Sequence, residues 1–434
     1  MKPQLNTSVL KAGASFYQAK QLIGIKHSVV TILDKNQLVK PKRLRHNRIQ
    51  LEQILETETE KLKGNSAEVK PTNANTKANQ RRKKRQTIKQ GVVIMVPHKI
   101  PRRLSSRARA FNWLLRCTAK PAIFFFHDHP TALKAFDIAY TQACTLLKFN
   151  HTPRAIKITP EKLTHCEGEW LRARGIDEQK VIYYLHGGAY FLSSPKLHRS
   201  VTWRLSSFTR RAVFALDYRD APTHDITHCL EDAVEGYEFL LKSGFKPENI
   251  IIAGDSAGGH LSLLTLQYLR DHKIPMPAAA LLISPWTDLS CQSESLQKNN
   301  LSDPFFWGHA IKTMGRFFTS ARDASIPLLS PVNGDFKDLP PLMFLVGSIE
   351  VLRDDARRAA ERAFDAGVKV CYEEWQDMPH IFPFFSNVIP EGRKAFKHMA
   401  AFVRAVENKS LTQFLKQHTA LHAKHPSEQI CTYA

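Results

Sequence analysis

The chain has 434 residues, of which 43% are hydrophobic and 24% charged, proportions that are ordinary for a folded globular protein. No run of 18 apolar residues occurs, so the sequence predicts no transmembrane helix, and the first 30 residues lack the pattern of a signal peptide. The seven cysteines are scattered and form no C-x-x-C pair, which argues against a disulfide framework or a zinc ribbon and predicts a reducing, cytoplasmic setting.

The positive charge is concentrated at the N-terminus. Lys and Arg number 62 against 40 Asp and Glu, a net charge of +22. Residues 1–100 hold 21 basic and 6 acidic residues, or +15, which leaves +7 for the remaining chain. This segment is poor in aromatic residues and contains the basic run 81–85, so we predict a largely disordered basic arm. The run is either simply solvated or contacts a membrane surface or polyanion; no nucleic acid is expected to be required for activity. Translation from Met95 would omit most of the arm.

An amphipathic helix is predicted just after the arm. Its apolar residues recur at helical spacing, with arginines between them: Leu104, Ala108, Phe111 and Leu115. A basic helix of this kind either packs against a domain or lies on a membrane surface, and packing is the favoured interpretation. A second helical stretch is predicted over residues 131–147.

After residue 175 the pattern alternates between strand and helix. Apolar runs predict strands at 181–185, 212–216, 250–253, 278–283, 342–346 and 368–373. Helices are predicted at 231–241, 258–270, 353–364 and 393–406. This alternation indicates a mostly parallel sheet with helices on both faces. The interruption at 290–326 contains a predicted helix at 304–318, and the predicted domain spans 101–408, followed by a polar tail at 409–434.

A G-x-S-x-G pentapeptide at residues 254–258 lies between a predicted strand and a predicted helix. A sharp strand-to-helix turn forces the central side chain outward, and the helix N-terminus favours negative charge there. Ser256 is therefore the candidate nucleophile. The alternative, a glycine-rich turn with an incidental serine, is disfavoured by the motifs that accompany it.

A second glycine motif follows the strand 181–185, where His186, Gly187, Gly188 and Ala189 precede a tyrosine. Successive glycines leave backbone N–H groups free to bind an oxyanion. We predict Gly187 and Gly188 as donors, with Ala257 as a third, each worth about 3 kcal/mol of transition-state stabilisation.

The remaining catalytic groups follow from chain order, since this topology places the acid and then the histidine after the serine. Of the histidines beyond residue 346, His380 alone follows a strand and lies in a loop, which makes it the candidate general base. Three acids follow the strand 342–346. Asp354 and Asp355 are predicted in the first turn of a helix, where acids stabilise its dipole, so Glu350 is the favoured partner of the histidine.

Together these motifs resemble the hormone-sensitive-lipase family of α/β-hydrolases. Residues 186–190 are similar to its H-G-G-G motif, 254–259 to its nucleophile elbow, and 216–222 to its D-Y-R-L-A-P stretch. The family's acid segment aligns with 350–354, which supports Glu350. The resemblance implies the α/β-hydrolase fold, a helical cap at about 104–148 and 290–326, and hydrolysis of short- to medium-chain acyl esters or lactones. Supporting roles are expected for His186, Ala189 and Asp255.

Three departures from the family pattern are visible: Ala189 replaces the third glycine, Asp220 replaces a leucine, and residues 223–227 replace the usual E-H-P-F-P segment. Alanine reaches positive φ less easily than glycine does. Amide or N-acetyl hydrolysis and non-catalytic binding of a small molecule on the same fold are the alternatives. The aromatic residues of the interruption are expected to line an acyl pocket or to pack in the core: Phe305, Phe306, Trp307, Phe317 and Phe318.

No metal or nucleotide cofactor is expected, because the sequence lacks H-E-x-x-H, G-x-G-x-x-G and P-loop motifs. The histidines at 127, 129, 418, 422 and 425 are interpreted as surface residues. The expected partner is a small-molecule ester, and the sequence does not predict an oligomeric state.

Overall fold

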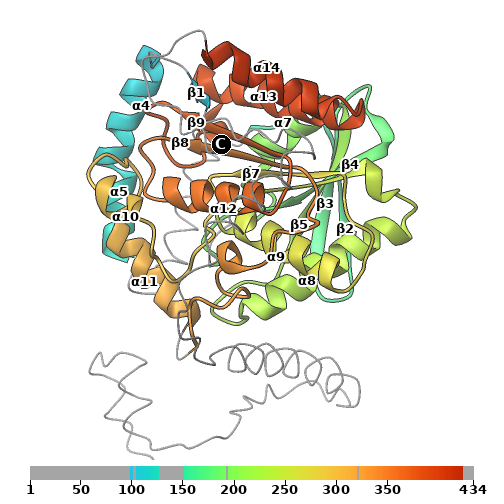
Figure 1. Ribbon diagram of the computed structural model, residues 1–434, viewed down its shortest axis with the longest axis horizontal. Helices are drawn as coiled ribbons and strands as arrows, with labels where there is room; N and C mark the ends of the chain where they lie inside the picture. The colour runs from blue at the N-terminus through green and yellow to red at the C-terminus, as the bar shows by residue number, and fades with distance from the viewer. Residues whose placement is uncertain (1–97, 101–103, 127–150, 192–193, 320–321, 424–434) are drawn as a thin grey trace, which may run out of the picture. The chain divides into compact units, whose positions relative to one another are not determined.

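A computed structural model describes residues 98–100, 104–126, 151–191, 194–319 and 322–423, and these residues are built around one nine-stranded sheet (Figure 1). The strand order is β1-β9-β8-β7-β6-β4-β5-β3-β2. Neighbouring strands are parallel except at β2–β3 and β3–β5. The predicted mostly parallel α/β architecture is therefore confirmed.

The predicted strands all form, and they make up the centre of the sheet. They are β4 (Asp177–Leu185), β5 (Arg211–Asp217), β6 (Ile250–Asp255), β7 (Ala279–Ile283), β8 (Leu342–Gly347) and β9 (Val370–Trp375). β6, β7 and β8 are buried throughout, which explains why their sequences are continuous apolar runs.

Three strands were not predicted: β1 (His98–Ile100), β2 (Lys157–Lys162) and β3 (Glu167–Arg172). β1 and β2 form the two edges of the sheet, and β3 lies between β2 and β5. β2 contains two Lys and one Glu and is partly exposed, whereas β3 is mostly buried but contains two Glu and one Arg. Neither strand therefore has the continuous apolar run of the central strands. β1 is only three residues long.

Helices cover both faces of the sheet (Figure 1). One apolar core lies beneath α8 (Ile226–Lys242), α9 (Ala257–Asp271) and α12 (Arg353–Asp365). The other lies beneath α7 (Arg199–Thr209) and α13 (Pro390–Glu407). α14 (Leu411–Ala423) begins in the predicted polar tail and buries Leu411 and Leu415 in the second core.

The predicted cap regions contain four described helices: α4 (Ser106–Cys117), α5 (Ala119–Phe126), α10 (Ser295–Lys298) and α11 (Gly308–Thr319). Figure 1 shows α5, α10 and α11 side by side. On α4 the predicted apolar face is buried, at Ala108, Phe111 and Leu115, which confirms that this helix packs against the domain. Ser105 caps α4, and its N–H and Oγ–H donate to Glu391 of α13 at 2.8 and 3.0 Å. The helix predicted over 131–147 lies outside the described residues.

No described helix is both long and apolar enough to cross a membrane. The described cysteines are free thiols at positions 117, 166, 229, 291 and 371.

Candidate active site

Ser256 occupies the single-residue turn between β6 and α9. Its backbone has φ 51° and ψ −118°, a conformation that is costly for any residue with a side chain. The turn is held by the Ser256 N–H, which donates to the Ile283 carbonyl at 2.9 Å. Glycine is needed on both sides, because a Cβ at Gly254 would lie 2.3 Å from the Gly258 oxygen, and one at Gly258 would lie 2.0 Å from the Leu185 oxygen. The motif spacing thus follows from close backbone packing.

The structure brings Ser256, His380 and Glu350 together, although they are up to 124 residues apart in the chain. His380 Nε2 lies 3.0 Å from Ser256 Oγ, and His380 Nδ1 lies 2.9 Å from Glu350 Oε2. The second Glu350 oxygen accepts from Ser284 Oγ at 2.7 Å and from the Gly347 N–H at 2.5 Å. Each of the three side chains is less than a tenth exposed.

The protonation of His380 suits a general base. Burial alone would lower the pKa of this imidazole, but the hydrogen bond and charge of Glu350 outweigh it and raise the pKa above its ordinary value. A carboxylate only accepts hydrogen bonds, so Nδ1 carries the proton that points to Glu350. The lone pair of Nε2 is thereby directed at Ser256 Oγ.

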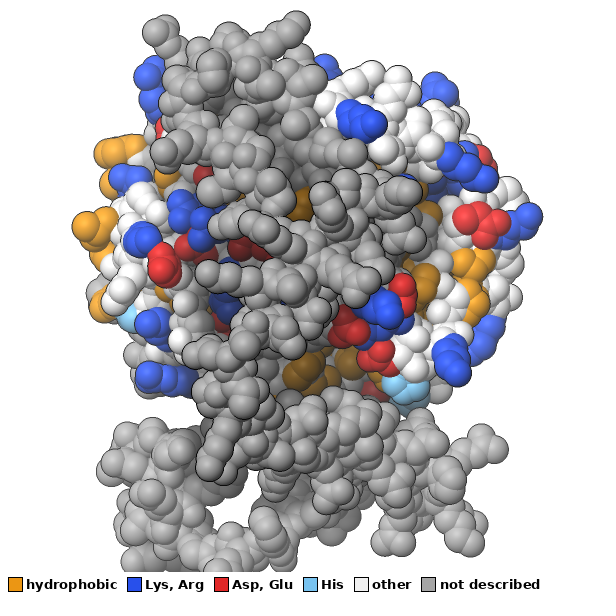
Figure 2. All heavy atoms as spheres, in the orientation of Figure 1, with side chains coloured by type: hydrophobic (Ala, Val, Ile, Leu, Met, Phe, Trp, Pro, Cys, Tyr) orange, Lys and Arg blue, Asp and Glu red, His pale blue; other side chains and the backbone are white. Residues whose placement is uncertain are grey.

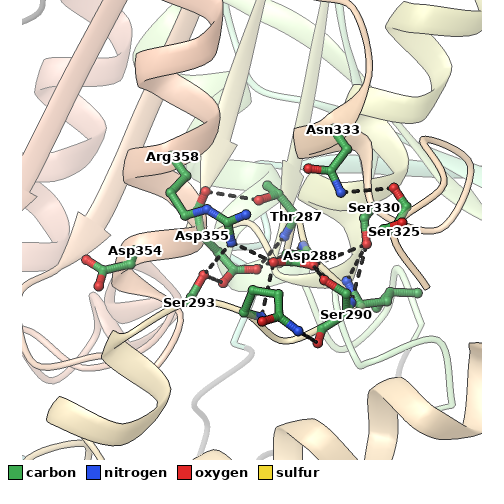
Figure 3. Close-up of polar contacts among 12 residues, drawn as sticks. Thr287, Asp288, Ser290, Ser293, Ser325, Ser330, Asn333, Asp354, Asp355 and Arg358 are labelled. Atoms are coloured by element: carbon green, nitrogen blue, oxygen red, sulfur yellow. Dashed lines mark hydrogen bonds and ion pairs between the residues drawn. The ribbon is translucent and has the colours of Figure 1, made fainter. Parts of the chain in front are cut away.

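The two other candidate acids are engaged elsewhere. Figure 3 shows Asp355 beside Asp288, with Ser293 and Arg358 directed toward them. Asp355 Oδ2 accepts the backbone N–H groups of residues 287 and 288 at 2.9 and 3.0 Å. Asp354 accepts the N–H of residue 295 at 2.9 Å and pairs with an arginine. Among the three candidates, Glu350 is the acid that reaches the histidine.

The glycine loop requires one correction, because the Gly187 N–H already donates to Asp255 Oδ1 at 3.0 Å. It is therefore not available to an oxyanion, and its prediction as a donor was wrong. The other predicted donors, Gly188 and Ala257, and also Ala189, have backbone N–H groups without a hydrogen-bond acceptor among the described residues.

The buried Asp255 carboxylate fixes the glycine loop by accepting hydrogen bonds. Besides the Gly187 amide, it accepts from Tyr184 Oη at 2.5 Å and from His198 Nε2 at 3.2 Å. Burial opposes the ionisation of Asp255, but the positive neighbour His198 and these hydrogen bonds lower its pKa below the ordinary value. The carboxylate thus links the nucleophile turn to the glycine loop.

His186 supports the same loop. Its Nδ1 donates to the Gly187 carbonyl at 2.8 Å, and its ring stacks on Tyr218 with centroids 4.3 Å apart. The Tyr218 hydroxyl donates to the His186 carbonyl at 2.6 Å. Burial lowers the pKa of His186 to about 4, so this imidazole is neutral at physiological pH.

Ala189 and Tyr190 both adopt positive φ, at 53° and 62°. The departure of Ala189 from the family glycine therefore falls at a position where glycine would be less strained. A buried contact stabilises this conformation: the Tyr190 hydroxyl lies 2.6 Å from His260 Nδ1, and His260 Nε2 donates to the Leu329 carbonyl at 3.1 Å. A carbonyl only accepts, so Nδ1 must accept from the tyrosine, and burial lowers the pKa of His260 to about 4.

The sequence interpretation missed the contribution of His260. The available signal was its position on α9, four residues after Ser256, which places it on the same side of the helix as the nucleophile turn.

One group of described side chains has the spacing of metal ligands: His165, Asp232 and Glu235. Both oxygens of Asp232 accept from Arg219, at distances of 2.7 to 3.0 Å, and Glu235 accepts the N–H of residue 164. Arg219 already pairs with Asp232, and His165 Nδ1 lies 3.1 Å from Glu235, so these contacts are those of ion pairs.

Comparison with known proteins identifies the family to which this fold belongs. A family model described as alpha/beta hydrolase fold matches residues 182–384. The chain is 40% identical over 247 residues to an acetyl-hydrolase of Streptomyces hygroscopicus. This match covers 57% of this chain and 82% of that protein. It is 34% identical over 267 residues to an esterase of Acinetobacter venetianus, with coverages of 61% and 87%.

Solved structures give the same result. An esterase/lipase from an uncultured bacterium is 35% identical, with a TM-score of 0.65, and the match covers 70% of this chain and 99% of that one. Sheet topology and turn geometry define an α/β-hydrolase. The chain belongs to the hormone-sensitive-lipase family of that fold. The predicted enzyme class, a carboxylic ester hydrolase, is confirmed.

The Asp355→Asn variant tests the cluster in Figure 3. Burial, together with the nearby charge of Asp288, raises the pKa of Asp355 from 3.8 to about 7 in the folded protein. Between pH 4 and 7 the folded state therefore binds a proton that the unfolded state releases, and the free energy of unfolding falls with pH by on the order of 1 kcal/mol per unit. Urea unfolding should show the variant gaining stability relative to wild type across this window and no further above it. If the free energies of unfolding of the variant and the wild type changed with pH in parallel, the raised pKa of Asp355 would be contradicted. Asp338→Asn, at an exposed site, is the control and should follow the wild type.

The Tyr190→Phe variant tests how the loop is held. It keeps the ring but removes the hydroxyl that binds His260, so the loop amides lose a constraint that matters most in the transition state. We expect kcat for a p-nitrophenyl ester to fall tenfold or more, with KM changed little. Tyr237→Phe removes a hydroxyl that donates to the Pro275 carbonyl at 2.7 Å and should leave kcat unchanged. A KM effect alone in Tyr190→Phe would contradict the positioning role.

Proposed function

We propose that this protein is a serine carboxylester hydrolase that acts on short- to medium-chain acyl esters or lactones. The observation that carries the proposal is the buried hydrogen-bonded series Glu350–His380–Ser256, with donor–acceptor distances of 2.9 and 3.0 Å. A serine becomes a nucleophile when a base lies within hydrogen-bonding distance and a third group orients that base. The two contacts of His380, with Ser256 and with Glu350, support both conditions.

In the proposed reaction, Ser256 Oγ attacks the ester carbonyl carbon while His380 Nε2 takes the hydroxyl proton. Glu350 stabilises the imidazolium that forms. The tetrahedral intermediate then collapses, the C–O bond to the alcohol breaks, and the imidazolium returns its proton to the leaving alcohol. Water repeats the sequence on the acyl-enzyme, which releases the carboxylic acid and restores the serine.

The oxyanion is proposed to bind the N–H groups of Gly188, Ala189 and Ala257. The Gly187 N–H donates to Asp255, which supports Ala189 rather than Gly187 as an oxyanion donor. Ala257 is the first residue of α9, where the helix dipole adds to the stabilisation of negative charge.

Aromatic side chains lie beside the proposed site. The Phe306 ring lies edge-on to His380, with centroids 5.2 Å apart. Beside the glycine loop, Phe191 contacts Phe317 and Phe318 of α11 at 4.6 and 4.9 Å. We propose that Phe306, Phe317 and Phe318 line the acyl pocket. One solved relative, 35% identical, was soaked with p-nitrophenyl butyrate, a short acyl ester.

Activity toward p-nitrophenyl acetate, butyrate, octanoate and palmitate tests the function. The wild type should hydrolyse the shorter esters best, and Ser256→Ala should lower kcat/KM by about 10³-fold or more. If the folded wild type turns over none of these esters, the ester hydrolase proposal fails and small-molecule binding becomes the leading function. Activity on N-acetyl amides but not on esters would favour the amide hydrolase alternative.

The Glu350→Gln variant tests the charge beside the base. With Glu350 present, the raised pKa of His380 moves the acid limb of the kcat/KM profile above the ordinary histidine value. Without that charge, burial lowers the pKa, so the acid limb should move to lower pH while kcat falls by about 10³-fold. Asp354→Asn, which removes an acid that does not touch His380, should leave the limb in place. An unshifted limb in Glu350→Gln would contradict the assignment of the acid.

A further inference from the structure

We propose that the outer face of the cap helices is a docking surface for an anionic lipid bilayer. This outer cap face consists of the exposed side chains of α4, α5, the loop 299–303 and α11. Within the described residues, all of the large hydrophobic side chains that are exposed lie on these segments: Trp113, Leu114, Phe124, Leu301 and Phe317. Trp113 is 67% exposed and Leu301 is 76% exposed. A clustering of this kind marks an interaction site.

The four segments form one continuous surface. The Arg116 guanidinium at the end of α4 donates to the Ser302 carbonyl at 2.7 Å, next to Leu301. The Lys120 ammonium of α5 donates to the carbonyls of residues 300 and 303, each at 2.7 Å, and lies 4.0 Å from the Trp307 ring centroid. These contacts fix α4 and α5 to the loop that carries Leu301.

The charge of this face has one sign. Residues 104–126 contain no Asp or Glu, and residues 299–319 contain only Asp303, which is fully buried. Five exposed basic residues lie on the same helices, and none of them forms an ion pair with a described residue: Arg107, Arg109, Arg116, Lys312 and Arg316. The face therefore combines exposed apolar side chains with unneutralised positive charge.

On α4 the two kinds of residue share one side of the helix. Arg109, Trp113 and Arg116 are spaced i, i+4 and i+7, opposite the buried face that contains Phe111 and Leu115. Figure 2 shows hydrophobic and Lys or Arg side chains next to one another along the edge of the domain where α4 lies in Figure 1.

An anionic lipid surface fits this combination better than a nucleic acid does. Both attract Lys and Arg, but only the lipid interface also accepts exposed Trp and Leu side chains into an apolar layer. Tryptophan in particular favours the headgroup level. Phe317 extends the face toward the proposed active site, because it contacts Phe191 beside the glycine loop. If the proposed function holds, docking would present lipid-dissolved esters to Ser256.

Vesicle flotation with the full chain tests the proposal. Wild type should bind vesicles of phosphatidylcholine with 30% phosphatidylglycerol more tightly than phosphatidylcholine alone, and salt should weaken the binding. The double variant Trp113→Ser with Leu301→Ser should lower the partition coefficient at least tenfold. The triple variant Arg109→Gln, Lys312→Gln and Arg316→Gln should also lower it more than tenfold, since each basic residue contributes about fivefold near an anionic surface.

A matched control removes three exposed lysines that precede the amino ends of β7, β8 and β9, opposite the carboxyl ends where Ser256 lies: Lys273→Gln, Lys337→Gln and Lys369→Gln. It changes the net charge by the same amount as the triple variant and should bind vesicles as wild type does.

All variants keep the basic segment 1–97, so its contribution is constant. Equal binding by wild type and both outer-face variants, equal loss in the control, or no vesicle binding at all would each overturn the proposal. Hydrolysis of soluble p-nitrophenyl butyrate is read separately and should be unchanged in every variant, so a failed docking surface is distinguishable from a failed catalytic proposal.

Discussion

The buried carboxylate of Asp255 is the constraint on which the site depends. It directly precedes Ser256 at the end of β6, and it accepts hydrogen bonds from β4, from the glycine loop and from the histidine that precedes α7. A buried charge is stable only when such donors surround it. Satisfying Asp255 therefore requires these three segments to meet at one point. The turn that holds Ser256 and the glycine loop proposed to supply the oxyanion donors are positioned relative to each other by this requirement.

Around that centre, the turn at Ser256 and the glycine loop both have strained backbone. Ser256, Ala189 and Tyr190 all adopt positive φ. The Ser256 backbone is held by its N–H hydrogen bond to Ile283. The Tyr190 hydroxyl binds His260 of α9, which in turn binds the Leu329 carbonyl. The cost of the strained backbone is offset by packing and buried hydrogen bonds elsewhere, which is the usual arrangement at functional sites.

Much of the fold and site could be predicted from the sequence because the signals are local. Continuous apolar runs mark the buried parallel strands, and Ser256, Glu350 and His380 each follow one of them, so a parallel sheet brings them to one edge. The strands β2 and β3 were not predicted because charged residues interrupt their apolar residues, Lys and Glu in β2 and Glu and Arg in β3. The availability of the Gly187 amide could not be read from the motif, because its partner Asp255 lies 68 residues away in the chain.

The cap also combines features that local sequence signals predict with features that depend on residues far apart in the chain. The sequence predicted the buried face of α4 correctly, because helical spacing of apolar residues identifies it. The exposed Trp113 and Leu114 break that spacing, and their meaning depends on α5, α11 and the loop around Leu301, which only the three-dimensional arrangement brings together.

The central claim is that His380 activates Ser256 as a nucleophile. Labelling with diethyl p-nitrophenyl phosphate, followed by peptide mass mapping, tests it most directly, because the phosphoryl group is trapped on the serine that attacks. The account predicts one adduct, on the peptide that contains Ser256, formed in step with loss of esterase activity and greatly slowed in His380→Ala. Labelling of a different residue in step with the loss of activity, or full activity after stoichiometric labelling of Ser256, would contradict it.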